Sequence, residues 1–164
     1  METAWKRIRK KLEAMGVAYE DRIRMDTIRR WEEKYRVVLP EELVMLYCEV
    51  CNGCAMIDGF RLKGIEEWEI DENRIQQPFP FQQYWIWEED HQENRLIQTQ
   101  YGNIELLDMG DSQSWHIIVD GPQRGQMWFF TDVGIQPCAP PKNVLEWFEC
   151  WLDGKEDYFE AFQP

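Results

Sequence analysis

The chain has 164 residues, of which 44% are hydrophobic and 14% aromatic, enough apolar material for one folded domain over residues 1–164. Residues 1–36 hold 11 Lys/Arg and 7 Asp/Glu, a net charge of +4, whereas residues 37–164 hold 7 and 24, a net charge of −17. Phosphate binding depends on cations, so this charge excludes nucleic acid as the expected partner of the main body.

The first 36 residues predict two amphipathic helices. In "METAWKRIRKKLEAMG", apolar residues recur at helical spacing and Gly16 can end the helix in the left-handed conformation. The segment has no continuous apolar run, so we do not expect a secretory signal. No run in the chain approaches the ~18 apolar residues that a membrane span needs. A second helix is expected to begin at Asp26 or Thr27, with Ile28, Trp31 and Tyr35 facing inward.

The segment "RVVLPEELVMLYCEVCNG" is the clearest helix in the sequence. Pro40 suits the first helical position, where its missing N–H removes no hydrogen bond. Asn52-Gly53 is expected to end the helix, since both residues tolerate the left-handed conformation. The buried stripe is predicted to consist of Leu43, Leu46, Tyr47 and Val50.

Three cysteines, Cys48, Cys51 and Cys54, stand at intervals of three in this region. Cluster ligands of the ferredoxin type need a fourth cysteine close by, followed by proline, and here the next cysteine is Cys138. A structural zinc site needs two ligand pairs, and neither His91 nor His116 belongs to one. We therefore interpret the three thiols as packing or incidental surface groups, with a metal site as the alternative. The odd total of 5 Cys favours reduced thiols and a cytoplasmic protein.

From residue 55 onward the apolar pattern changes to short β-branched and aromatic runs separated by turn residues. In "GNIELLD", Ile104 and Leu106 alternate with Asn103 and Glu105, as in a strand with one buried face. "KGIEEWEIDENR" fits either a helix or an irregular strand. The predicted strands are "AMIDGFRL", "QYWIWEE", "RLIQTQ", "GNIELLDMG", "SWHIIVDG" and "GQMWFFTD".

The C-terminal segment returns to helix. Asn143 can cap "VLEWFECWLDG", which Gly154 ends, and a last helical turn is expected through Tyr158, Phe159 and Phe162. Helices, then strands, then helices predict an α+β domain, in which an antiparallel or mixed sheet of five to six strands carries helices on one face.

The serine, histidine and aspartate residues that a catalytic triad would need occur close together only in "LDMGDSQSWHI". Ser112, Ser114 and His116 lie near Asp108 and Asp111, but a hydrolase needs an activated nucleophile and a base held by a third group. Gly-Asp-Ser is also a common hairpin turn. The acidic runs at 66–72 and 88–90 could act as acid/base groups or Mg²⁺ ligands, although such runs usually form solvated faces. We expect a protein that is not an enzyme and needs no cofactor.

The order of these elements resembles the SUKH superfamily, which includes fungal cell-wall-synthesis regulators and bacterial immunity proteins. Ile28 and Glu32 on one helix, Leu39-Pro40 at the start of the next and Asn52-Gly53 at its end resemble the opening signature of that family. The resemblance spans residues 25–155, although the usual second glycine is Cys54 here and residues 61–77 do not align. The later matching positions are Gly102, Asp108, Gly110, Gly121, Gly125 and Trp128.

The resemblance implies a non-catalytic protein-binding module, an immunity protein that neutralises a basic toxin domain of nuclease or deaminase type. A regulatory or scaffold protein with a cellular partner is the alternative. The expected interface has aromatic anchors and an acidic rim. The first candidates are Trp85 and Trp87 with Glu88, Glu89 and Asp90, and the second are Trp68 with Glu66, Glu67 and Glu69. Each of these tryptophans could instead belong to the core.

Overall fold

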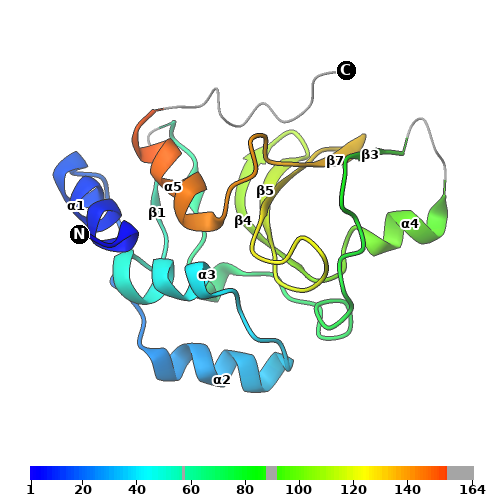
Figure 1. Ribbon diagram of the computed structural model, residues 1–164, viewed down its shortest axis with the longest axis horizontal. Helices are drawn as coiled ribbons and strands as arrows, with labels where there is room; N and C mark the ends of the chain where they lie inside the picture. The colour runs from blue at the N-terminus through cyan, green and yellow to red at the C-terminus, as the bar shows by residue number, and fades with distance from the viewer. Residues whose placement is uncertain (57, 88–91, 155–164) are drawn as a thin grey trace.

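The computed structural model of the chain describes residues 1–56, 58–87 and 92–154. The protein is an α+β domain in which one curved sheet separates a layer of helices from an irregular segment (Figure 1). The helices are α1 (Ala4–Met15), α2 (Met25–Tyr35), α3 (Glu41–Met45), the π-helix η1 (Leu46–Val50), the 3-10 helix η2 (Ile65–Glu67), α4 (Glu93–Gln98) and α5 (Val144–Leu152).

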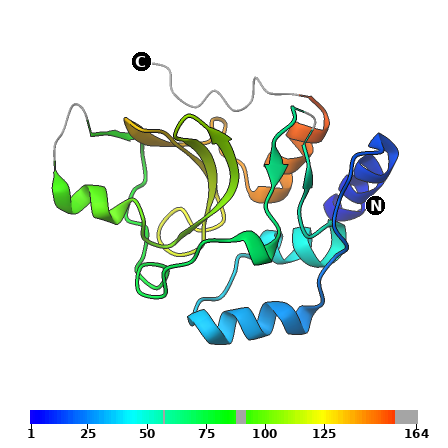
Figure 2. The same ribbon diagram turned by 180° about the vertical axis from the view of Figure 1, so that it is seen from behind.

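The sheet has seven strands in the order β1-β2-β4-β5-β6-β7-β3, and every neighbouring pair is antiparallel. Its curvature is visible from behind (Figure 2). The predicted α+β class is confirmed, with slightly more strands than the five to six expected. The strands are β1 (Cys54–Ala55), β2 (Arg61–Leu62), β3 (Trp85–Ile86), β4 (Asn103–Gly110), β5 (Gln113–Ile118), β6 (Met127–Phe130) and β7 (Gly134–Pro137).

Two predicted strands differ from the structure. The run "AMIDGFRL" contains the end of β1 and all of β2, which pair with each other instead of forming one strand. Residues 95–100, expected to be extended, belong mainly to α4. The apolar pair Leu96 and Ile97 suggested a strand, but both side chains are more than 40% exposed and neither packs into the sheet. Within residues 83–87, the described part of "QYWIWEE", only Trp85–Ile86 is a strand, and "KGIEEWEIDENR" contains the short helix η2. The helical turn expected through Tyr158, Phe159 and Phe162 lies outside the described residues.

The predicted helix ends are largely confirmed. Gly16 has a φ of 69° after α1, and α2 begins at Met25, one residue before the expected start. The Asn143 side chain accepts a hydrogen bond from the Glu146 N–H, and the Glu146 side chain accepts one from the Asn143 N–H, a complete capping box.

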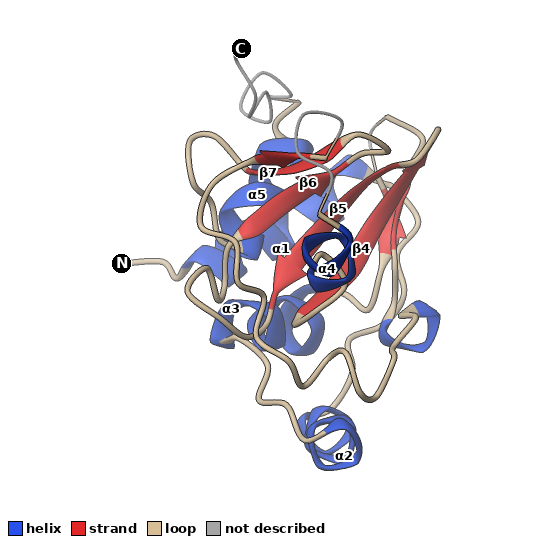
Figure 3. Ribbon diagram, turned by 90° about the vertical axis from the view of Figure 1, so that its right-hand side faces the viewer, coloured by secondary structure: helices blue, strands red, loops and turns tan. Residues whose placement is uncertain are grey.

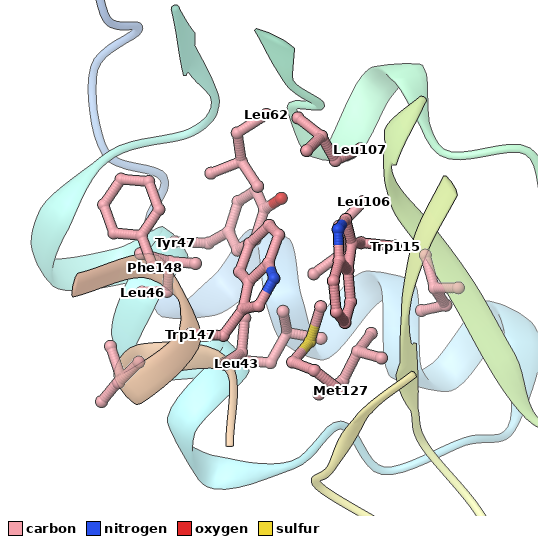
Figure 4. Close-up of a cluster of buried hydrophobic side chains, with 14 of the residues drawn as sticks. Leu43, Leu46, Tyr47, Leu62, Leu106, Leu107, Trp115, Met127, Trp147 and Phe148 are labelled. Atoms are coloured by element: carbon pink, nitrogen blue, oxygen red, sulfur yellow. The ribbon is translucent and has the colours of Figure 1, made fainter. Parts of the chain in front are cut away.

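The main hydrophobic core lies between the helices and one face of the sheet (Figure 4). Trp115 on β5 and Trp147 on α5 face each other across this layer with ring centroids 6.0 Å apart. A register shift between Glu105 and Leu107 interrupts the alternation of β4, so that Leu106 and Leu107 are both fully buried. The helical side contributes the whole predicted stripe of Leu43, Leu46, Tyr47 and Val50.

A cluster of charged side chains links α1 to α5. Arg7 donates to both carboxylate oxygens of Glu149, at 2.7 and 2.9 Å, and Lys11 pairs with Glu149 and with Asp153 at 2.8 Å. The Arg7 guanidinium is the main reason that the pKa of Glu149 falls to about 2. These pairs neutralise part of the basic charge of the N-terminal segment within the fold.

The second face of the sheet is covered by parts of residues 69–87 and 92–102, which include α4 (Figure 3). Six buried side chains form a separate aromatic cluster there: Phe79, Phe81, Trp85, Ile118, Trp128 and Ile135. The sequence predicted helices on one face only. The other face is covered as well, by a mostly irregular segment that includes α4.

A close backbone approach holds this segment against the sheet. The Phe79 N–H donates to the Asp120 carbonyl oxygen at 3.0 Å. Gly121, at a φ of 117°, lies so close that an added Cβ would be 2.2 Å from the Phe79 carbonyl oxygen. Only glycine fits this position, because both the conformation and the space exclude a side chain. No helix within the described residues is long and apolar enough to cross a membrane.

Candidate functional site: an acidic and aromatic cleft

A cleft of about 530 Å³ opens between the second face of the sheet and the segment that covers it. Its floor comes from β4, β5 and β6, and its walls come from residues 69–75, Trp87 and the region of α4. This volume falls within the roughly 300–1,000 Å³ that is typical of binding pockets. The lining residues are Glu69, Ile70, Asp71, Arg74, Ile75, Trp87, Leu96, Thr99, Gln100, Asn103, Glu105, His116, Phe130 and Thr131.

Hydrogen bonds made by the backbone fix both walls of the cleft. The Asp71 carboxylate accepts from the Asn73 and Arg74 N–H groups, which closes a tight turn and lowers the pKa of Asp71. The Gly102 N–H donates to the Arg74 carbonyl oxygen at 3.1 Å and so joins the two walls. The cleft is therefore formed in the free protein and needs no ligand to shape it.

His116 lies at the floor of the cleft with both ring nitrogens engaged. Its Nδ1 is 2.7 Å from the Asn103 Oδ1, and its Nε2 is 2.8 Å from the Ser114 Oγ. The Asn103 side-chain nitrogen donates to the carbonyl oxygens of Thr99 and Tyr101, so its oxygen must face the histidine. Nδ1 therefore carries the proton, and Nε2 accepts a hydrogen bond from the Ser114 hydroxyl.

The environment of His116 keeps its ring neutral. Burial, assisted by the charge of Lys63, lowers the pKa of His116 to about 3. The ring stacks on Phe130, with centroids 3.8 Å apart and planes at 11°. At neutral pH the floor of the cleft is thus a pair of flat, uncharged rings.

Glu105 lies beside this pair on β4, directly across the ladder from His116. One carboxylate oxygen, Oε2, pairs with the Lys63 Nζ at 2.5 Å. The other, Oε1, is 3.9 Å from the His116 Nε2, which has no proton to donate in the tautomer derived above. Oε1 is therefore an acceptor at the floor of the cleft.

The chain Ser114–His116–Asn103 has the same order of groups as a hydroxyl nucleophile, a base and an orienting residue. Its surroundings differ from those of a hydrolase. Ser114 is buried and is not among the residues that line the cleft. A pKa of about 3 also makes His116 a weak base at neutral pH. Ser112 lies in the exposed turn between β4 and β5, with a φ of 62°, as the hairpin interpretation predicts.

The structure brings two of the predicted interface residues together. Trp87, from the first predicted patch, and Glu69, from the second, line the same cleft. The Trp87 indole N–H donates to the Asp132 carbonyl oxygen at 2.8 Å, which fixes the ring. Glu88, Glu89 and Asp90 lie outside the described residues.

Two predicted contact residues are core residues instead. Trp85 is 5% exposed and packs on Phe81, and Trp68 is 7% exposed and packs edge-on against Trp31. Their burial removes both side chains from the set of exposed anchors. The physical reason is that each faces an aromatic cluster, as strand and loop tryptophans commonly do.

Glu66 and Glu67 are exposed but serve the fold. Both oxygens of Glu66 accept from the Asn52 side-chain nitrogen at 3.0 Å, which ties η2 to the end of η1. Glu67 pairs with Arg61 at 2.6 Å and also accepts from the Gly64 N–H, and these contacts lower its pKa.

The cysteines have separate environments. Cys51 and Cys54 are fully buried, and Cys48 is half-buried with its sulfur 3.6 Å from that of Met25. Contact with Cys51 and burial both raise the pKa of the Cys54 thiol. Among residues 1–56, 58–87 and 92–154, no group of three His, Cys, Asp or Glu side chains is arranged to hold a metal ion.

Several cleft residues escaped prediction because their chemistry depends on register. The alternation of β4 places Asn103 and Glu105 on one face, but only the pairing of Glu105 with His116 shows that this face carries the histidine. The contributions of Asp71 and Arg74 depend on how residues 69–75 fold back over the sheet, for which the sequence has no periodic signal. Comparisons with protein-family models, curated proteins and solved structures gave no match for this chain.

Proposed function

We propose that this chain is a non-catalytic protein-binding module: a SUKH-like, cytoplasmic immunity protein that neutralises a toxin of nuclease or deaminase type by direct binding. The observation that carries the proposal is the cleft itself. It unites Glu69 and Trp87, which the sequence analysis assigned to two separate patches, in one concave surface.

The chemistry of the cleft supports a protein ligand with a basic surface. Glu69, Asp71 and Glu105 contribute carboxylates, and Arg74 is the one cation among the lining residues described. Residues 37–164 as a whole carry −17. Complementary charge accelerates encounter with a basic partner and disfavours acidic ones. Nuclease and deaminase domains bind polyanions, so the proposed partner class presents the basic surface that such a cleft needs.

The buried position of Ser114 supports binding rather than catalysis at this site. A substrate in the cleft would meet His116, Phe130 and the carboxylate of Glu105, which line it, whereas Ser114 is buried and does not line it. The Ser114–His116–Asn103 chain then acts as a support that holds the histidine ring flat.

The experiment is affinity capture from the source cells, followed by a toxicity test. The tagged protein is compared with Glu69→Lys at the cleft and with Glu33→Lys on α2, an equally exposed site with the same change in net charge. We expect a basic toxin domain that is retained at low salt by the wild type and by Glu33→Lys but lost by Glu69→Lys. Co-expression should suppress its toxicity.

Two results would overturn the proposal. Capture of a cellular regulatory or cell-wall protein, with no protection against any neighbouring toxin, would favour the scaffold alternative. A catalytic activity abolished by both Ser114→Ala and His116→Ala, with folding intact by circular dichroism, would favour an enzyme.

A further inference from the structure

We propose that the cleft selects an arginine side chain of the partner, in preference to lysine, as its central contact. This inference rests on the proposed function and names the chemistry that the same cleft would recognise. It is argued from three features: an excess of carboxylates over cations in the lining, flat neutral rings, and an arginine that the chain already holds in a similar setting.

The first feature is the charge balance of the lining. Lys63 satisfies one oxygen of Glu105, and the tautomer of His116 leaves the other oxygen as an acceptor. Glu69 and Asp71 are both exposed at the wall opposite the floor. With Arg74 as the cation on that wall, the described lining retains an excess of negative charge, which favours a cationic side chain.

The second feature is the shape of the apolar surface. His116 and Phe130 stack on each other, so the faces between them are occupied, and Trp87, held by its hydrogen bond to Asp132, is the lining ring outside that stack. A guanidinium group is planar, weakly hydrated and able to stack on rings while its edge donates several hydrogen bonds. An ammonium group is compact and strongly hydrated, so it gains less from flat walls.

The third feature is an internal precedent. Arg95 on α4 places its guanidinium carbon 5.2 Å from the ring centroid of Phe81 and 5.1 Å from that of Trp85. The ring centroid of Trp85 in turn lies 5.7 Å from that of Trp87, a residue of the cleft. The aromatic cluster next to the cleft thus already holds an arginine against two rings.

The rim adds a place for a flanking apolar residue. Leu96 on α4 lines the cleft yet is 43% exposed, and its neighbour Ile97 is 45% exposed. An exposed apolar pair beside a charged cleft is typical of an interface in which apolar contacts surround a buried anchor. The ligand class is therefore a basic segment in which arginine lies next to an apolar residue.

The test uses three blocked peptides, acetyl-Gly-Leu-X-Gly-Gly-amide, in which X is arginine, lysine or citrulline. Citrulline keeps the planar shape and removes the charge. Titration into the ¹⁵N-labelled full-length protein, followed by NMR, reports the Trp87 indole and the amides of residues 69–75 and 96–103. We expect saturable shifts at these positions, about fivefold tighter binding of arginine than of lysine, and no saturation with citrulline.

Matched variants complete the test. Glu69→Gln is expected to weaken binding of the arginine peptide several-fold, and Glu33→Gln on α2 to leave it unchanged. Equal binding of arginine and lysine, shifts outside the cleft, or no saturation with arginine up to about 10 mM would each overturn the inference.

The outcome also separates this inference from the proposed function. If a toxin is captured and neutralised but the cleft shows no preference for arginine, the inference fails and the immunity function stands. If arginine binds selectively but the natural partner is not a toxin, the immunity function fails and the arginine site stands.

Discussion

The cluster of charged side chains between α1 and α5 yields a quantitative prediction about how stability depends on pH. Glu149 accepts two hydrogen bonds from Arg7 and one ion pair from Lys11, and its side chain is 17% exposed. The Glu149→Gln substitution keeps the shape of the side chain and removes its charge. It should therefore destabilise the protein at neutral pH without creating a cavity.

The magnitude follows from the pKa of Glu149, which falls from 4.5 to about 2 on folding. A shift of this size corresponds to at most about 3 kcal/mol of stability. Arg7 is 46% exposed, so solvent screening reduces the expected effect to about 1–2 kcal/mol. Because the folded pKa is depressed, this stability is fully present above pH 4.5 and is lost as the pH falls toward 2.

The assay is urea unfolding followed by tryptophan fluorescence at pH 7 and at pH 3.5, on either side of the isoelectric point near 4.6. We expect the difference in free energy of unfolding between wild type and Glu149→Gln to be about half as large at pH 3.5 as at pH 7. Glu13→Gln, an exposed carboxyl group of α1, serves as the control. An equal difference at both pH values, or one below about 0.3 kcal/mol at pH 7, would refute the electrostatic account.

Four further substitutions, one of them a matched control, test the packing and hydrogen bonds of the fold. Gly121→Ala should cost about 3 kcal/mol or more, or yield insoluble protein, whereas Gly125→Ala, also left-handed but with open space, should cost about 1 kcal/mol by urea unfolding. Tyr47→Phe should cost about 1–2 kcal/mol by thermal unfolding, since it leaves the part-buried Lys63 carbonyl oxygen without its donor. Asn143→Ala removes the cap of α5 and should cost about 1 kcal/mol in the same assay, and no change would contradict the capping geometry.

The helices could be predicted from the sequence because helical spacing and capping patterns are local features of the chain. Leu43, Leu46, Tyr47 and Val50 recur at helical spacing, and Asn143 precedes a run with glutamate three residues later. Such signals depend on a few neighbouring residues and need no knowledge of the rest of the chain. The seven-stranded sheet was recognised as a class for the same reason, through alternation in β4 and β5.

The cleft could be predicted only in part, because it is formed by contacts between residues that are far apart in the sequence. Trp87 and Glu69 were singled out by composition, but their meeting depends on β3 pairing with β7, some 50 residues later. Burial of Trp68 and Trp85 likewise depends on which aromatic partners reach them. The pair Leu96 and Ile97 misled prediction because two adjacent apolar residues fit a short strand as well as an exposed helical turn.

The position of β3 has a consequence for biosynthesis. Its register partners are Ile135 and Gly134 on β7, so the strand emerges from the ribosome long before the one it needs. The wall that contains Trp87 is anchored only when β7 exists, and the floor residue Phe130 belongs to the strand beside it. A nascent chain that has not passed residue 137 therefore has no finished cleft. A ligand of the cleft can therefore bind only after β7 has been synthesised.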